Sequence, residues 1–260
     1  MYKLEEFFGL LDGIAPIKYS YMQIEQGAYD NSGISLKFHN GVEKALFSLD
    51  LSVESVKKAA RLKCDTVVTH HPAIYHAIKS LDANGETASV AIAAKNGLNV
   101  ISMHLNLDVA AGGIDDSLCT GLGGENPKFL NGLDENAHYG REFSVSGTLA
   151  EFKKRINEKF GTKKTLVYGR PNDKAGVAAS FCGGGADYAL SYVRNGGAAD
   201  TIITSDMPHH VLKELTERGK QVIILTHYAS ENYGFKKFYE KVKEIAENAE
   251  LFYFEDKRFL

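Results

Sequence analysis

The sequence predicts an α/β protein made of two similar halves. A short strand motif occurs twice, the same order of elements surrounds each copy, and a histidine–carboxylate pair follows each copy. The motif reads "DTVVT" at 65–69 and "DTIIT" at 200–204. Coincidence is the alternative, since short strings of this kind are common. Because three features recur in one order, we interpret the halves as an approximate internal duplication.

Each half reads as strand, helix, strand, helix, strand. In the first half "KALFSLD" and "LSVESVKKAARLK" precede the motif, and "GLNVISMHLNLD" follows it. In the second half "GVAASF", "ADYALSYVRNGGA" and "GKQVIILTHYASE" take the same places. This alternation predicts mostly parallel sheets with right-handed crossovers, covered by helices in three layers. The predicted halves are 1–124 and 125–260, with the C-terminal segment packing on the first half.

Two further segments have clear periodicity. A strand at Phe143–Ser146 leads into a helix that Gly161 ends as its C-terminal cap. The apolar face of that helix consists of Leu149, Phe152, Ile156 and Phe160. The C-terminal "GFKKFYEKVKEIAENAELFYFED" predicts a long helix followed by a strand.

Composition and charge restrict the class of protein. The 260 residues are 44% hydrophobic and 24% charged, with a net charge of −3. No dense basic block is present, which argues against nucleic acid as the main partner. We find no signal-peptide pattern and no membrane-spanning run. The three widely spaced cysteines form neither a CxxC pair nor a disulfide framework, so we expect a cytoplasmic protein.

Two adjacent histidines follow the first strand motif. Val67 and Val68 are typical of a buried strand, and Pro72 prevents that strand from continuing. His70 and His71 therefore lie where a strand gives way to a loop, which is where open α/β sheets bind ligands. Side chains alternate along an extended chain, so we expect the two histidines to point apart and to hold two different ions.

Two pairs share the pattern H-x-x-x-carboxylate after an apolar run: His104 with Asp108, and His227 with Glu231. His227 and Glu231 share one face if the chain turns helical after Leu225. Taken singly, such a pair is typical of a solvated helix face, and "HHP" of a loop histidine. Every member follows a buried-looking strand, so we predict one shared metal site. Its predicted ligands are His70, His71, Asp108, His227 and Glu231.

Imidazole and carboxylate ligands suit Zn, Mn, Fe, Co or Ni. Two such ions in one site would activate water for hydrolysis. Around this site we assign candidate roles to six further residues. His104 and Tyr228 are candidates for catalysis or for orienting a ligand, Tyr75 and His76 are candidates for substrate binding, and His209 and His210 in "MPHH" begin a helix with a structural or pocket-lining role.

The segment "CGGGAD" contains a run of glycines between a strand and a helix. The amides of Gly183, Gly184 and Gly185 are candidates for holding an anion such as phosphate at the helix N-terminus. A tight strand-to-helix turn with close packing is the alternative.

Five ordered motifs resemble those of the NIF-three-like family, whose members are named GTP cyclohydrolase 1 type 2 homologues. They are "YDNSGISL", "VVTHHP", "HLNLDVAAGGIDD", "TIITSDMPHH" and "THYASE", and they span nearly the whole chain. The resemblance implies two intertwined α/β domains, a dinuclear metal centre between them and a homohexameric ring. It carries the family's metal ligands onto the same five residues that the spacing selects, and His104 onto a family histidine near the metals.

This chain departs from the family pattern at two positions near the motifs. Leu105 stands where the family often has Thr, and Thr226 stands where it usually has Gly. Neither position is a predicted ligand. Thr226 nevertheless adds a side chain and a hydroxyl beside His227.

The leading functional hypothesis is a dinuclear-metal-dependent hydrolase of a nucleotide-like or phosphorylated small molecule. The resemblance points to opening of the imidazole ring of GTP. The alternative is a metal-binding protein without catalysis, acting as a metal carrier, an insertion factor or a regulatory adaptor. A purely structural role for the metals is a third hypothesis.

Overall fold

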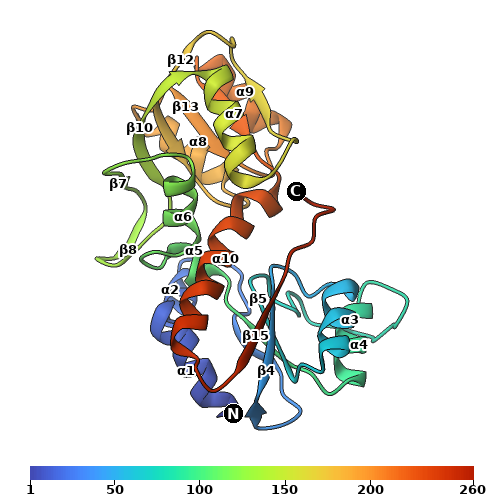
Figure 1. Cartoon of the computed structure of the whole chain (residues 1–260). Coiled ribbons are helices and arrows are strands. Elements are labelled where there is room, and N and C mark those ends of the chain that lie inside the picture. The colour runs from blue at the N-terminus through green and yellow to red at the C-terminus, as the bar shows by residue number, and fades with distance from the viewer. The chain divides into compact units, whose positions relative to one another are not determined.

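The protein is described by a computed structural model of residues 1–260, which form two compact units (Figure 1). Unit 1 comprises Met1–Ala110 with Phe235–Asp256, and unit 2 comprises Ala111–Gly234 with Lys257–Leu260. The segment from Ala111 to residue 124, which the prediction placed in the first half, belongs to unit 2. Phe235–Asp256 belongs to unit 1, on which the C-terminal segment was expected to pack. Helix packing and long-range strand pairing, described below, account for both placements.

Unit 1 is built on a five-stranded sheet in the order β15-β4-β5-β6-β2. Its strands are β2 (Gly33–Leu36), β4 (Lys44–Ser48), β5 (Thr66–Thr69), β6 (Asn99–Ser102) and β15 (Glu250–Phe254). All neighbouring pairs are parallel except β2 with β6. The predicted parallel arrangement of the first half is therefore confirmed. β15 belongs to unit 1 because it pairs with β4 along its whole length.

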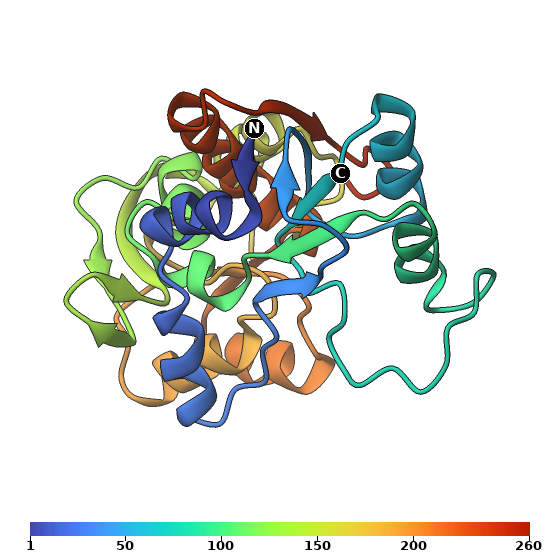
Figure 2. The same ribbon diagram turned by 90° about the horizontal axis from the view of Figure 1, so that it is seen from below.

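Helices α3 (Val53–Leu62) and α4 (Ala88–Lys95) connect β4, β5 and β6 and lie side by side in both views (Figures 1 and 2). Alternation along β4 decides what each face of the sheet contacts. Leu46 belongs to the core beneath α3 and α4. The ring of Phe47 packs instead against Phe235 and Phe238 of α10 (His227–Ile245). Burying each such side chain contributes roughly 1.5–3 kcal/mol.

The remaining elements of unit 1 lie near its N-terminus, with one short helix after β6. They are β1 (Tyr2–Lys3), α1 (Leu4–Ile14), α2 (Lys18–Glu25), β3 (Gly41–Val42) and α5 (Leu105–Val109). β1 pairs with β3 in a small antiparallel sheet. α5 packs against α2 and begins directly after His104, which places the candidate site at its N-terminus.

Unit 2 is built on a six-stranded mixed sheet in the order β11-β14-β13-β12-β10-β7. Its strands are β7 (Lys128–Phe129), β10 (Arg141–Thr148), β11 (Leu166–Tyr168), β12 (Lys174–Ser180), β13 (Thr201–Thr204) and β14 (Gln221–Ile224). The three central strands, β12, β13 and β14, are parallel, as predicted. The outer strands β10, β7 and β11 are antiparallel. A separate hairpin joins β8 (Gly132–Asp134) to β9 (Ala137–His138).

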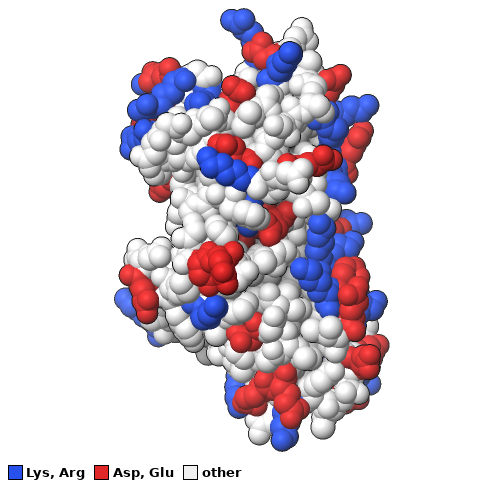
Figure 3. Space-filling model, turned by 90° about the vertical axis from the view of Figure 1, so that its left-hand side faces the viewer, with Lys and Arg blue, Asp and Glu red and all other residues white.

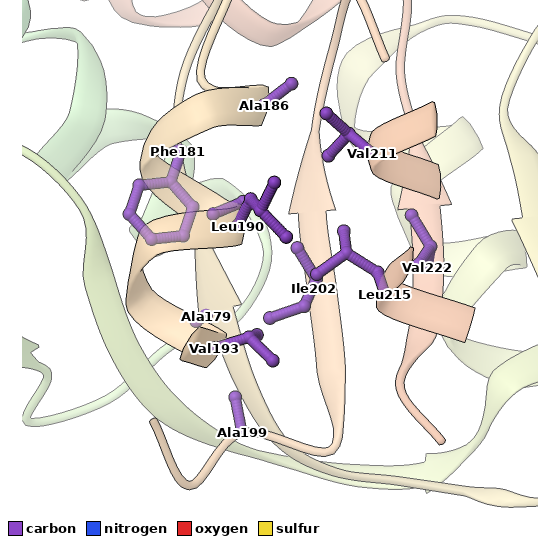
Figure 4. Packing of buried hydrophobic residues seen from close by; sticks show 11 residues of the cluster. Ala179, Phe181, Ala186, Leu190, Val193, Ala199, Ile202, Val211, Leu215 and Val222 are labelled. Atoms are coloured by element: carbon purple, nitrogen blue, oxygen red, sulfur yellow. The ribbon is translucent and has the colours of Figure 1, made fainter. Parts of the chain in front are cut away.

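One face of the unit 2 sheet is covered by α8 (Ala186–Arg194) and α9 (His209–Glu217). Figure 4 shows Leu190 of α8 and Leu215 of α9 directed toward Ile202 of β13. The helices α6 (Ile114–Gly121) and α7 (Leu149–Phe160) pack on β10 and β12. Packing of α6 on these strands explains why the segment after Ala110 belongs to unit 2. Both units thus have the predicted layered α/β fold.

Helix α7 confirms the periodicity analysis. Its four predicted face residues are all buried, and Gly161 ends the helix in the left-handed conformation with φ of 64°. Thr148 caps the N-terminus by accepting a hydrogen bond from the amide of Glu151. The predicted C-terminal helix and strand correspond to α10 and β15.

Basic and acidic side chains are interspersed on the face shown in Figure 3. The three cysteines are buried and form no disulfide with one another. None of the helices has the length and apolar character needed to cross a membrane.

Candidate metal centre

His70 and His71 follow directly on the end of β5. Both of their backbone amides donate to the carbonyl oxygen of Leu49, at 3.1 and 3.0 Å. The chain has therefore left the extended conformation, and regular alternation of side chains ends with the strand. Their ring centroids lie 4.9 Å apart. The expectation that the two side chains point to opposite sides is wrong for this reason.

The His70 ring is fully buried, and a hydrogen bond at Nδ1 fixes its orientation. Its Nδ1 lies 2.8 Å from the carbonyl oxygen of Met103. A carbonyl only accepts, so Nδ1 carries the proton and Nε2 keeps its lone pair. Nε2 lies 3.4 Å from Oδ1 of Asp108, which is also buried and lies on α5. His70 and Asp108 therefore bring a nitrogen and an oxygen, both of kinds that bind metal, close to each other.

Two more histidines in unit 1 follow the same pattern. Nδ1 of His71 donates to Asp50 at 2.7 Å, and Nδ1 of His104 donates to Asp30 at 2.8 Å. Burial acts to raise the pKa of Asp30, but the hydrogen bond and charge of His104, together with hydrogen bonds from Ser20 and Ser32, outweigh it and leave this pKa below its ordinary value. One donor nitrogen from each of His70, His71 and His104 lies within 4.8 Å of the other two.

Unit 2 contributes one histidine held between two carboxylates. His227 is the first residue of α10, and Glu231 lies one turn later on the same face, as predicted. Nε2 of His227 lies 3.0 Å from Oε1 of Glu231, while Nδ1 donates to Asp206. Burial alone would lower the pKa of His227. The charges of Glu231 and Asp206 outweigh burial and raise that pKa to about 11.

Thr226 positions His227 by starting the helix. Its hydroxyl accepts a hydrogen bond from the amide of Ala229 at 3.1 Å and donates to the carbonyl oxygen of Phe259 at 3.0 Å. This is the usual role of a threonine at the residue before a helix. The departure from the family pattern at Thr226 is thus accounted for by helix capping.

The glycine run lies between β12 and α8, and Gly183 packs tightly against the side chains of His227 and Glu231. Gly183 has φ of +54°, and a Cβ there would collide with Oε1 of Glu231 and lie 3.3 Å from Nε2 of His227. Its amide donates to the hydroxyl of Ser230 at 3.2 Å. A Cβ at Gly185 would collide with Phe181, whereas one at Gly184 would meet nothing within 4 Å. Close packing therefore accounts for Gly183 and Gly185, and anion binding by this turn stays a prediction.

The remaining predicted residues have varied positions. Tyr75 and His76 are exposed in the loop between β5 and α4. The ring of Tyr228 is buried, with its centroid 6.0 Å from that of Phe259. His209 and His210 are exposed at the start of α9, which confirms that "MPHH" begins a helix.

Three acidic residues at this centre were missed by sequence reasoning: Asp30, Asp50 and Asp206. Each accepts a hydrogen bond from Nδ1 of a histidine. A signal was present for two of them, because Asp50 and Asp206 each come two residues after a strand that neighbours the strand before the histidine. Asp206 also has φ of +40°, an uncommon conformation for a residue other than glycine.

The donor chemistry of both groups fits a transition metal. Metal-binding histidines generally donate their second ring nitrogen to a carboxylate or a carbonyl oxygen, which fixes the tautomer. All four histidines here have that partner. In unit 1, His70, His71, His104 and Asp108 come together, and in unit 2 His227 and Glu231 do. Each unit thus contains histidine and carboxylate groups able to bind metal.

Comparison with known proteins agrees with this picture. Residues 2–257 match the family Duf34/NIF3 (NGG1p interacting factor 3). A GTP cyclohydrolase 1 type 2 homolog of Clostridium perfringens is 28% identical over 93% of this chain and 92% of its own length. A protein of the same name from Methanocaldococcus jannaschii is 30% identical over 81% of this chain and 85% of its own length.

Solved structures show the same fold. A Bacillus cereus protein related to NIF3 superposes with a TM-score of 0.85 at 17% identity, covering 98% of this chain and 97% of its own. The reduced HcgD protein of Methanocaldococcus jannaschii superposes with a TM-score of 0.81 at 27% identity, covering 98% of each chain. The sequence match extends over nearly the whole chain and the fold agrees. This protein therefore belongs to the Duf34/NIF3 family.

Proposed function

We propose that this protein is a metal-dependent hydrolase of a nucleotide-like or phosphorylated small molecule. We propose as metal ligands His70, His71, Asp108, His227 and Glu231, binding two divalent ions. One observation carries the proposal: each histidine of the two groups donates its Nδ1 proton to an oxygen, as metal-binding histidines generally do. The names of the curated relatives support the nucleotide-like substrate.

Bound divalent ions would lower the pKa of water toward neutrality and stabilise negative charge on an oxygen of the substrate. Side chains of this protein would hold the metal ligands and the substrate in position for this reaction. Asp50 and Asp206 hold the rings of His71 and His227 in one orientation each. His104, held by Asp30, lies beside His70 and His71, with ring centroids at 5.2 and 5.6 Å. It is therefore our candidate for moving a proton to or from the substrate.

The first experiment measures metal content per chain by mass spectrometry on untagged protein purified without added metal or chelator. We expect about two equivalents, with a clear decrease in His71→Ala and in Glu231→Gln. His210→Ala is the matched control, because His210 is exposed on α9 and should leave the metal content unchanged. Metal content near zero after Zn, Mn, Fe and Co have been offered would disprove the metal site.

Turnover is tested next, with metal-loaded protein and a panel of nucleotides, phosphoesters and amides. Glu231→Gln should abolish any activity found. No turnover of any compound by metal-replete, correctly assembled protein would contradict the hydrolase proposal.

A non-catalytic metal carrier or adaptor is the second candidate function. It is favoured by the use of Asp30, Asp50 and Asp206 as histidine partners, because none of these carboxylates is then a separate acid or base. A carrier should release its ions to a competing chelator within minutes, whereas an enzyme should retain them through many turnovers. Isotope exchange of bound zinc separates these two outcomes.

Assembly and location stay predictions. The hexamer rests on the family resemblance alone, and light scattering should give six times the 28.5 kDa chain mass if it is correct. The cytoplasmic location is a prediction from the cysteine usage.

A further inference from the structure

An exposed cluster of aromatic side chains lies beside the histidines of unit 1. It consists of Tyr29, Tyr75 and His76. The ring centroids of Tyr29 and Tyr75 are 4.9 Å apart, and His76 lies 4.6 Å from Tyr29 and 4.8 Å from Tyr75. Tyr29 is 49% exposed and Tyr75 42% exposed, so substantial ring surface remains in water. We refer to these three side chains as the aromatic cluster.

The backbone around the cluster is held in place by hydrogen bonds. The hydroxyl of Tyr75 donates to the carbonyl oxygen of Tyr29 at 3.2 Å. The side-chain amide of Asn31 donates to the carbonyl oxygen of Ile74 at 2.7 Å. These bonds join the loop after β5 to the segment before β2. The rings are therefore arranged before any ligand binds, which lowers the entropy cost of binding.

The cluster is also connected to the candidate catalytic histidine. Asp30 follows Tyr29 in the chain, has a fully buried side chain and accepts the hydrogen bond from His104. The ring centroid of Tyr75 lies 6.2 Å from that of His104, with the two planes nearly perpendicular. A small molecule lying on the cluster would therefore have another part within reach of His104.

The loop that carries Tyr75 and His76 is unusually long. Residues 70–87 contain neither helix nor strand. Connections longer than about 12–15 residues without regular structure are uncommon in compact domains and usually functional. Anchoring of the loop would account for the contact between the rings of Tyr29 and Tyr75. It does not account for their exposure, because both tyrosines keep nearly half of their surface in water beside His104.

We propose that the aromatic cluster binds the planar ring of a substrate, in the way that aromatic side chains stack on nucleobases. The inference rests on the proposed function and narrows it, because it selects compounds with a heteroaromatic ring over ring-free sugar phosphates. Stacking is tolerant of base identity, since every base has a π-face. The cluster therefore supplies affinity for the ring, while the histidines and carboxylates supply the chemistry.

Calorimetric titration tests this inference with AMP, GMP and UMP as ring-bearing probes and ribose 5-phosphate as the ring-free probe. Wild-type protein should bind at least one nucleotide about tenfold more tightly than ribose 5-phosphate. Tyr29→Leu and Tyr75→Leu should remove most of this difference. Tyr21→Leu is the matched control, because Tyr21 is 58% exposed on α2 outside the cluster and should keep it.

Two additions make the result decisive. Tyr75→Phe keeps the ring and loses only the hydroxyl, so it should retain the preference even if Tyr75→Leu is poorly folded. The titrations are repeated after chelator treatment, because stacking needs no metal and the preference should persist. Equal affinity for nucleotides and ribose 5-phosphate, or an unchanged preference in folded Tyr29→Leu, would overturn the inference. Metal content, measured in parallel, reports separately on the proposed metal site.

Discussion

The two units hold their donor groups by different means. In unit 1, His70, His71 and His104 each have their own oxygen acceptor. In unit 2, His227 alone lies between Asp206 and Glu231. Unit 1 therefore offers several nitrogens fixed in orientation, whereas unit 2 offers one nitrogen in a strongly negative environment. Metal binding in unit 1 should therefore depend on the orientation of each histidine ring, and metal binding in unit 2 on the negative charge around His227.

Alignment of the repeated motifs shows how this difference arose. "DTVVTHH" corresponds to "DTIITSD", so His71 occupies the position of Asp206. Likewise His104 and Asp108 correspond to His227 and Glu231. The carboxylate after the second strand of one unit thus corresponds to an imidazole in the other. A duplicated backbone keeps the positions of polar side chains, while substitution changes which of them is the donor.

The largest expected effect comes from Gly183→Ala in unit 2. The new Cβ would displace the Glu231 carboxylate, and the left-handed backbone adds a cost of about 1–2 kcal/mol. We expect metal affinity to fall by at least the ~10–100-fold that loss of an outer partner causes. Zinc titration against a competing chelator measures it. Gly184→Ala is the control, since no atom lies near its Cβ. Equal zinc affinity in the two variants would show that Gly183 does not position Glu231.

Substitution of the acceptor carboxylates comes next and tests the comparison directly. Asn keeps an oxygen that accepts from Nδ1 but removes the charge. Asp206→Asn should therefore weaken zinc binding by about tenfold. Asp50→Asn should weaken it only a few-fold, because orientation of His71 is preserved. Asp187→Asn, at an exposed site on α8, should have no effect. If Asp50→Asn weakens zinc binding more than Asp206→Asn does, the conclusion that metal binding in unit 2 depends on charge is incorrect.

A smaller effect is expected on the pH dependence of stability of chelator-treated protein. The folded pKa of His227, about 11, lies above its ordinary value of 6.5. The folded state therefore binds more protons than the unfolded state between these values, and stability falls as pH rises. The stability advantage of wild type over His227→Gln should be largest below pH 6.5 and shrink steadily toward pH 11. Urea unfolding at several pH values measures it, and a constant difference would contradict the prediction.

The smallest effect concerns the reactivity of the cysteine thiols, which should be equally low in both units. Burial, followed by the charge of Asp65, raises the pKa of Cys64 in unit 1 to about 11. Burial, followed by the charge of Asp115, raises the pKa of Cys119 in unit 2 to about 12. Neither thiol should react with a disulfide reagent at neutral pH in folded protein, and all three cysteines should react in denaturant. Rapid labelling of either residue in the native state would show that it is exposed by local opening.

Local patterns alone determined most of the secondary structure. The apolar spacing in α7, its end at Gly161, and the alternation of strands and helices in each unit follow from periodicity and capping residues. These signals depend on neighbours within a few positions. The candidate metal ligands were also selected from local pattern, because each lies shortly after a strand that reads as buried.

Only the tertiary structure decided how those residues are used. The C-terminal segment was expected to pack on the first half, but its pairing as β15 with β4, a strand about 200 residues earlier, could not be read from the sequence. His70 and His71 lie on one side because both amides bond to Leu49, a residue of another loop. Asp30 finds His104, and Gly183 approaches Glu231, through contacts between segments distant in sequence. Periodicity carries no information about such contacts, because they depend on the packing of separate elements against one another.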